Sequence, residues 1–278
     1  MDLGEIFSYT FVQRALLAGI LIAAVSSILG VFLVLRRLSL IGDGLAHITF
    51  GGVAMVLLIG LSPLYVTLAA LPIVMLSSLA IFQLTRSKRI RGDAAIGIVS
   101  SIGIALGIIL SSLSGGYNVD LLSYLFGNIL TVTQTELALS LIIFLFVAAA
   151  VIFFYRDLFA VTFDEDLAKS MGIKTKRINI ILFLLTAVTA VLAMKITGIM
   201  LVSAMLILPP VTALQLSLSF KMTIFAAVGF SVLSVINGII VSFVLNLPAG
   251  GTIVMFNAVF LLIVFGAKKI LISRGNFK

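Results

Sequence analysis

The chain has 278 residues, of which 62% are hydrophobic and only 10% are charged. An ordinary soluble domain carries roughly 25% charged residues and turns much of its surface to water, so this composition excludes a soluble enzyme. The absence of cysteine also excludes a disulfide-stapled secreted protein, a thiolate metal site and a thiol nucleophile. With a mean hydropathy of +1.33, the composition predicts an all-α, polytopic integral membrane protein.

Nine runs are apolar enough to be membrane-spanning helices, each of which needs about 20 residues. In chain order they are Ala15–Leu35, Ile41–Gly60, Leu64–Leu84, Ala94–Leu113, Ala138–Tyr155, Ile178–Met194, Gly198–Leu218, Met222–Leu245 and Gly250–Ala267. The sixth and seventh runs lie so close together that one or both must be short or broken, which leaves eight or nine spans. The stretch Ser114–Leu137 fits no span, and we expect it to lie outside the membrane or to dip into it. Residues 1–278 are expected to form one transmembrane domain.

The net charge of +8 reflects membrane topology rather than binding to nucleic acid. All of the 18 basic residues except Arg14 and Lys195 fall in stretches that alternating spans place on one side of the membrane. The positive-inside rule makes this side cytoplasmic, next to anionic lipid, so the C-terminus is expected inside and the N-terminus outside. The stretch Met1–Gln13 lacks a basic region and is not expected to be a cleavable signal peptide. Lys195 is expected to snorkel to the outer interface.

Asp43 and His47 are the clearest candidate functional residues inside a predicted span, and His47 is the only histidine in the chain. Ionisable residues at membrane depth are costly and point to a function. Their i, i+4 spacing places both side chains on one face of a helix, about 6 Å apart. An imidazole and a carboxylate at this spacing form half of a site for a divalent transition metal.

Two ligands do not complete such a site, but a two-fold dimer with facing copies would supply four. The residues around the pair are small enough to let two helices approach closely: Gly42, Gly44, Ala46, Gly51 and Gly52. A structural interpretation stays open beside this one. Asp43 could cap a helix and pair with Arg36 or Arg37, and His47 could then be a hydrogen-bonded interior histidine.

The cytoplasmic segment, about residues 157–177, is predicted to contain a short helix. Asp164 can cap its first turn, and Glu165 and Asp166 suit the positive end of its dipole. Gly172 is suited to end the helix. A short helix presented to the cytosol between two spans is a candidate docking element for a soluble partner.

The apolar residues Leu167, Ala168 and Met171 are expected to share one face of this helix. A solvated loop is the simpler alternative for the same stretch. The dipeptide Gly-Lys does not occur anywhere in the chain, so the chain has no Walker A motif and cannot bind a nucleotide through a P-loop. Any energy from ATP must therefore come from a partner subunit.

These residues resemble the permease subunit of the ATP-binding-cassette importers for zinc, manganese and iron, which share the fold of cobalamin and siderophore importers. Four motifs in the family's order carry the resemblance, and together they extend over nearly the whole chain. The first consists of Ser39, Leu40, Gly42, Asp43, His47, Gly51 and Gly52. The second consists of Asp164, Glu165, Leu167, Ala168, Met171 and Gly172. The third and fourth are Gly198–Pro210 and Leu247–Thr252.

The resemblance implies a type II importer permease in the plasma membrane of a prokaryote, working as a homodimer with the metal path on its two-fold axis. It implies that Asp43 and His47 bind the transported metal and that the second motif couples to a separate ATP-binding subunit. An extracytoplasmic binding protein would deliver the ion. The protein itself would then be neither an enzyme nor the holder of a permanent cofactor.

Zn²⁺ is ranked first as the cargo because the residues around His47 look more like those of zinc members, with Mn²⁺ close behind and Fe²⁺ compatible. A proton-coupled secondary transporter using Asp43 is a second interpretation, although no inverted repeat is evident. An intramembrane metalloenzyme using His47 is a third, although the chain lacks a fuller ligand motif such as H-E-x-x-H.

Overall fold

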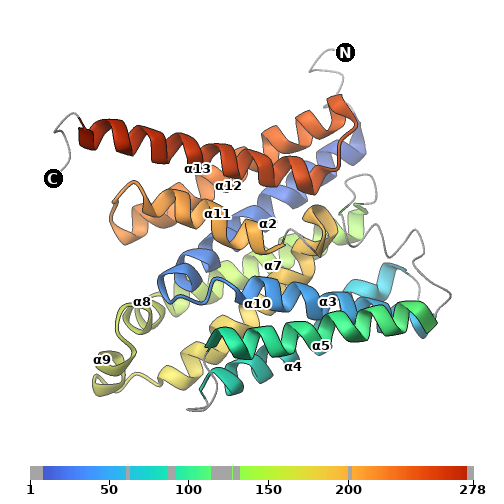
Figure 1. Ribbon diagram of the computed structural model, residues 1–278, viewed down its shortest axis with the longest axis horizontal. Helices are drawn as coiled ribbons and strands as arrows, with labels where there is room; N and C mark the ends of the chain where they lie inside the picture. The colour runs from blue at the N-terminus through green and yellow to red at the C-terminus, as the bar shows by residue number, and fades with distance from the viewer. Residues whose placement is uncertain are drawn as a thin grey trace.

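The computed structural model describes residues 9–60, 63–86, 92–113, 127, 132–199 and 202–273, and within these ranges the chain is helical without a strand (Figure 1). The helices are α2 (Thr10–Leu35), α3 (Ile41–Leu58), α4 (Pro63–Thr85), α5 (Gly92–Leu113), α7 (Gln134–Phe153), α8 (Tyr155–Phe163), α9 (Glu165–Ser170), α10 (Thr175–Thr197), α11 (Val202–Leu214), α12 (Phe220–Leu245) and α13 (Ala249–Ser273). A helix satisfies its backbone donors and acceptors within its own segment, which is what a lipid environment requires. The predicted all-α fold is confirmed.

Eight of the described helices are long and apolar enough to cross a membrane. They match the predicted spans with shifts of a few residues at their ends, except for the seventh span. In its place lies α11, which has only 13 residues and carries Pro209 and Pro210 inside it. The helix before it, α10, ends at Gly198, whose φ of 83° a residue with a side chain rarely adopts. The expectation that this pair of spans is short or broken is therefore confirmed.

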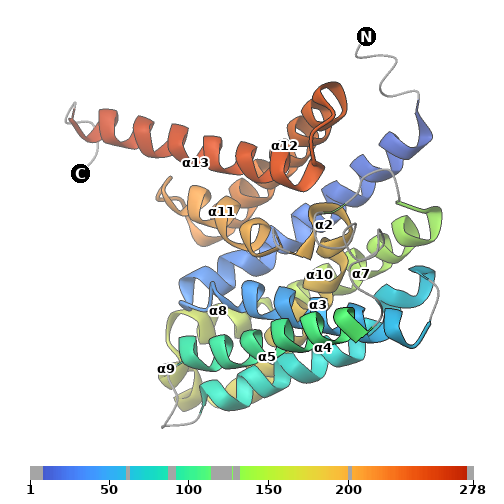
Figure 2. The ribbon, with the colours of Figure 1, turned by 45° about the vertical axis from the view of Figure 1, so that its right-hand side comes forward.

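Three helices form the centre of the bundle. In the spanning parts of α2, α3 and α10, 72% of the residues are buried, against 22% in α7 and α13. Helices α11, α12 and α13 lie on one side of α2 and α10, and α3, α4 and α5 lie on the other (Figures 1 and 2). The outer helices expose apolar side chains such as Leu262 and Phe146, which is stable where lipid rather than water surrounds the protein.

The two ends of the bundle differ. The turn between α2 and α3, the short helices α8 and α9, and the end of α13 all lie at one end (Figure 1). The start of α2 and the start of α7 lie at the opposite end (Figure 2). The described basic residues that the sequence assigns to the cytoplasm, such as Arg36 and Lys169, belong to elements at the first end.

The predicted irregular stretch 114–137 ends earlier than expected, because α7 begins at Gln134. Thr133 and Glu136 form a capping box, in which each side chain accepts a hydrogen bond from the other residue's backbone N–H, at 3.2 and 2.9 Å. Of residues 114–132, only Gly127 and Val132 belong to the described part of the chain. Residues 1–8 and the side chain of Lys195 also lie outside the described residues.

Candidate metal site and the contacts of α9

The structure brings Asp43 and His47 together near the start of α3. Asp43 lies in the first turn of the helix, where a carboxylate is favoured by the positive end of the dipole. His47 follows one turn later on the same face, with its Nε2 atom 3.5 Å from Oδ2 of Asp43. The predicted juxtaposition of an imidazole and a carboxylate is thus confirmed. The i, i+4 spacing within one helix is sufficient to bring the two side chains together.

The pair is the only opening in the Ile41–Ala54 part of α3, which is otherwise buried. Between Ile41 and Ala54, every residue of α3 except Asp43 and His47 is buried. The side chain of Asp43 is 48% exposed and that of His47 is 23% exposed. The two polar side chains therefore face out of the subunit through a gap in the packing around α3.

The alternative role of Asp43 as a helix cap does not hold. The residue that precedes α3 is Leu40, whose side chain makes no capping hydrogen bond, and Asp43 lies inside the helix. Arg36, one of the two partners proposed for Asp43, instead pairs with Glu165. His47, whose side chain is partly exposed, also differs from a fully buried, hydrogen-bonded core histidine.

The pair can supply one nitrogen and one oxygen ligand to a metal ion. Zinc binds such atoms at about 2.0–2.2 Å and usually takes four ligands. Across the described ranges, no group of three or more His, Cys, Asp or Glu side chains is arranged to hold a metal. A complete coordination shell would therefore need water or ligands from another molecule.

The glycines around the pair serve packing within the subunit, which corrects the prediction that they let two copies of α3 approach. A Cβ atom on Gly44 would lie 2.7 Å from a side-chain carbon of Ile96 on α5. One on Gly42 would lie 2.7 Å from the side chain of Leu206 on α11, and one on Gly51 would lie 2.7 Å from the backbone oxygen of Gly103. These glycines are buried against helices of the same chain, and so they hold the pair in place.

The predicted helix of the 157–177 segment is α9, and its ends are formed as expected. Oδ1 of Asp164 accepts a hydrogen bond of 2.9 Å from the backbone N–H of Leu167, which caps the first turn. Gly172 follows the last turn with a φ of 84°. Its N–H donates to the carbonyl of Lys169, and that of Ile173 donates to the carbonyl of Ala168, as in a Schellman motif.

The side chains of α9 divide between two faces. Leu167 is 58% exposed and Met171 is 69% exposed, whereas Ala168 is buried. The prediction that all three share one face is therefore wrong for Ala168, which packs against the bundle. Leu167 and Met171 form an apolar surface that the rest of the described chain leaves uncovered.

Glu165 is the residue of α9 that contacts the bundle through polar atoms. Its Oε2 atom lies 3.2 Å from Nη2 of Arg36, and its Oε1 atom lies 3.8 Å from Nη2 of Arg86. Nδ2 of Asn179 donates a hydrogen bond of 3.0 Å to the same Oε1 atom. Burial lowers the pKa of the Arg36 guanidinium from its ordinary value, and the Glu165 carboxylate opposes that change.

We call Glu165, Arg36, Arg86 and Asn179 the Glu165 cluster. The amino-acid sequence alone does not predict this cluster, because Arg36 and Glu165 are 129 residues apart and no local pattern links them. The one available signal was an arginine that directly follows a predicted span, and that position is common among cytoplasmic charges.

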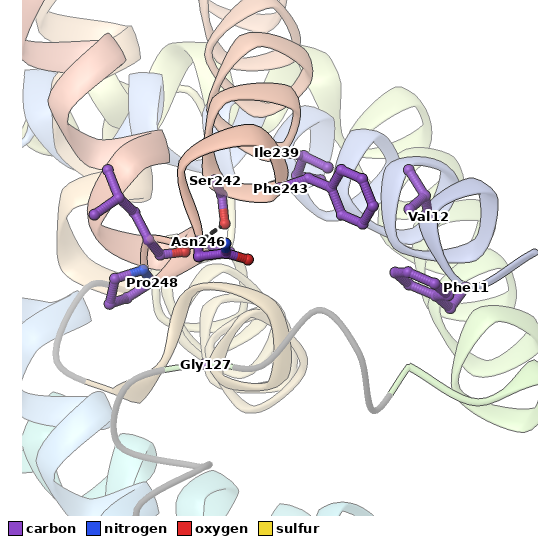
Figure 3. A pocket seen from close by; sticks show the side chains of 10 residues that line it. Phe11, Val12, Gly127, Ile239, Ser242, Phe243, Asn246 and Pro248 are labelled. Carbon is purple, nitrogen blue, oxygen red and sulfur yellow. Dashed lines mark hydrogen bonds between the residues drawn. The ribbon is translucent and has the colours of Figure 1, made fainter. Parts of the chain in front are cut away.

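A cavity of about 270 Å³ lies at the other end of the bundle. Its walls come from the start of α2, the end of α12 and the turn into α13, with Gly127 opposite (Figure 3). Ser242 and Asn246 are the only polar side chains in its described lining, which includes no carboxylate or imidazole.

The fold and these sites define a multi-pass, all-helical membrane protein with an open carboxylate–imidazole pair on a central helix. Comparison with known sequences gives the family. The chain belongs to the ABC 3 transport family, whose sequence model matches residues 8–268. This result confirms the resemblance on which the sequence analysis relied.

Two relatives and one solved structure place the chain within this family. It is 37% identical over 251 residues to the manganese transport system membrane protein MntC of Halalkalibacterium halodurans, covering 90% of this chain and 85% of the relative. It is 32% identical over 244 residues to the high-affinity zinc uptake system membrane protein ZnuB of Haemophilus influenzae, covering 88% and 92%. The solved structure of PsaBC from Streptococcus pneumoniae in complex with Fab gives a TM-score of 0.86 at 32% identity and covers 98% of this chain and all of that one.

Proposed function

We propose that this protein is the permease subunit of an ATP-driven importer that moves a divalent transition metal ion across the plasma membrane. The names of its relatives support this function, since they specify manganese or zinc transport and a membrane component. ATP hydrolysis takes place in a separate ATP-binding subunit, and a binding protein outside the cell delivers the ion.

The open Asp43–His47 pair is the observation that carries the proposal. Its ligands suit Mn²⁺, Fe²⁺ and Zn²⁺, and they lie in the part of α3, Ile41–Ala54, that is otherwise buried. A transport site has to bind an ion strongly enough to admit it and weakly enough to release it. A partial, exposed His/Asp site meets this requirement better than a closed cage of four protein ligands.

The incomplete ligand set supports a homodimer. Two copies related by a two-fold axis and facing each other through this opening would provide two carboxylates and two imidazoles. The metal path then runs along the axis. This arrangement uses the exposed side chains of Asp43 and His47 directly, while the neighbouring glycines stay within each subunit.

The exposed apolar side of α9 is the docking surface for the ATP-binding subunit. Leu167 and Met171 lie on this surface, while Asp164 and Gly172 fix the two ends of the helix. Because the end of the bundle that carries α9 also carries Arg36 and the last turns of α13, the positive-inside rule makes it cytoplasmic, together with the C-terminus.

The cargo is Mn²⁺ or Zn²⁺. The residues that follow His47 favour zinc by their likeness to zinc members of the family. The names of the relatives include more manganese systems than zinc systems. The pair itself accepts both ions, and uptake measured with each ion separately decides between them.

The test uses sealed vesicles that contain this chain, its ATP-binding subunit and the binding protein. We expect ATP-dependent uptake of Mn²⁺ or Zn²⁺ that is lost in Asp43→Ala and in His47→Ala, with assembly unchanged. Asp93→Ala is the matched control, because Asp93 is an exposed carboxylate in the first turn of the neighbouring helix α5. Normal uptake in both Asp43→Ala and His47→Ala would remove these residues from the path. Uptake that follows a proton gradient without ATP would instead identify a secondary transporter.

A further inference from the structure

One carboxylate joins α9 to three membrane helices. Arg36 is the residue that ends α2, Arg86 directly follows α4, and Asn179 lies near the start of α10. All three contact Glu165, at the distances given above. A displacement of α9 therefore acts on the ends of α2, α4 and α10 through the Glu165 carboxylate, in addition to the apolar packing of Ala168.

The neighbouring acidic residues do not make this link. Asp164 uses its carboxylate within α9, on the N–H of Leu167. Asp166 is exposed, and within the described ranges its carboxylate forms no ion pair with a membrane helix. Of the three consecutive acidic residues, Glu165 is the one that contacts membrane helices in the described part of the chain.

A short stretch of chain connects Arg36 to the Asp43–His47 pair. Its side chain is only 10% exposed, so it is held firmly where α2 ends. The turn that follows contains two backbone hydrogen bonds, from the N–H of Leu38 to the carbonyl of Leu33 at 2.9 Å and from the N–H of Ile41 to the carbonyl of Leu38 at 3.1 Å. Helix α3 starts at the end of this turn and carries Asp43 in its first turn. A movement of Arg36 is thus transmitted to the start of α3 through a short, ordered connection.

The Glu165 cluster also has unused hydrogen-bonding capacity. Nη1 of Arg36 and Oδ1 of Asn179 are buried and lack a partner among the described residues. One is a donor and the other an acceptor, so both can form new bonds when the Glu165 carboxylate shifts. These two groups are the ones that a second arrangement of the cluster would use, and a switching element needs such a second arrangement.

We infer that Glu165 is a positioning residue that transmits the movement of the ATP-binding subunit from α9, through Arg36 and the α2–α3 turn, to the Asp43–His47 pair. The inference rests on the proposed function. It assigns a different role to each of the two faces of α9. Leu167 and Met171 bind the ATP-binding subunit, whereas Glu165 transmits the displacement of α9 to the membrane helices.

The first test measures the number of metal ions imported per ATP hydrolysed in the reconstituted complex, with Mn²⁺ and Zn²⁺ as separate probes. Glu165→Gln keeps the size and shape of the side chain and removes its charge. We expect this variant to lower the ratio of imported ions to hydrolysed ATP about tenfold, a usual size for coupling between two sites. Assembly and ATP hydrolysis should stay close to wild type. Asp166→Asn makes the same change in charge one residue away and should leave the ratio unchanged.

A double-variant experiment tests the route through Arg36. Arg36→Gln should lower the ratio as Glu165→Gln does, and the double variant should be no worse than either single one, because both changes break the same link. Effects that multiply instead would show that the two residues act independently, which would contradict the inference.

A second measurement does not depend on transport. Because the chain has no cysteine, a single Leu40→Cys variant can carry a spin label in the α2–α3 turn, where Leu40 is 48% exposed. ATP should change the label's spectrum in the complex with Glu165 or with Asp166→Asn, but not with Glu165→Gln. An unchanged response in Glu165→Gln, or loss of ATPase binding by that variant, would overturn the inference.

If the proposed function is wrong, the experiments give a different result from the one expected if only the role of Glu165 is wrong. In that case wild-type vesicles show no ATP-dependent uptake of either ion, and the spin label in wild type does not respond to ATP. If wild type transports normally and Glu165→Gln keeps the wild-type ratio, only the inference about Glu165 fails.

Discussion

The contact between α3 and α5 offers a direct test of how the metal pair is held. A Cβ atom on Gly103 would lie 2.7 Å from Cα of Ile48 and 2.9 Å from the carbonyl carbon of His47. These are backbone atoms and cannot rotate away. Ordinary contact begins at 3.4 Å, so Gly103→Ala requires the two helices to separate locally by several tenths of an ångström.

We expect Gly103→Ala to destabilise the protein by about 1–3 kcal/mol, as overpacking of a closely fitted core usually does. It should also displace the backbone of His47 and reduce metal uptake. Gly97→Ala is the control on the same helix, because a Cβ at Gly97 meets no atom within 4 Å. That change replaces a poor helix former and should be neutral or stabilising by up to about 1 kcal/mol.

Unfolding of both variants, followed by circular dichroism during denaturation in mixed micelles, measures the difference. Gly107→Ala adds an intermediate case, because its Cβ would meet the ring of Phe50, a side chain that can turn aside. The expected order of stability is Gly97→Ala, Gly107→Ala, Gly103→Ala. Equal stability of the Gly97 and Gly103 variants would refute the argument that backbone contact fixes the position of α3.

Three further changes test local features of the fold. Asp164→Ala removes the cap of α9 and should cost about 1 kcal/mol, seen as faster hydrogen exchange at Leu167; unchanged exchange would contradict the capping role. Gly172→Ala places a side chain at a φ of 84° and should destabilise the end of α9 by about 1 kcal/mol, so an unaltered exchange rate at Ile173 would count against it. Ser78→Ala removes a buried hydrogen bond of 2.8 Å to the carbonyl of Phe183 and should cost about 0.6 kcal/mol, the mean for such bonds between membrane helices, in the same micellar unfolding assay; a stabilised variant would be inconsistent with this contribution.

The spans and both candidate sites could be predicted because they depend on local sequence. Apolar runs of sufficient length form helices in lipid whatever their neighbours are. The i, i+4 spacing of Asp43 and His47 fixes their common face once the helix exists. The cap at Asp164 and the stop at Gly172 likewise depend on residues a few positions away, and the structure contains both as predicted.

Other features depend on contacts between distant segments, which local patterns do not specify. The sequence placed the glycines around His47 at an interface between copies, but the structure uses them for α4, α5 and α11 of the same chain. It grouped Ala168 with Leu167, but packing against the bundle buries Ala168 and leaves Leu167 exposed.

The sequence by itself determined that this is a helical membrane protein and that an imidazole and a carboxylate share one face of its second span. Only the tertiary structure decided that this pair is the open part of the buried stretch Ile41–Ala54, and that Glu165 pairs with Arg36. The physical reason is that helix formation and side-chain spacing are short-range, whereas burial and ion pairing depend on which helices pack together.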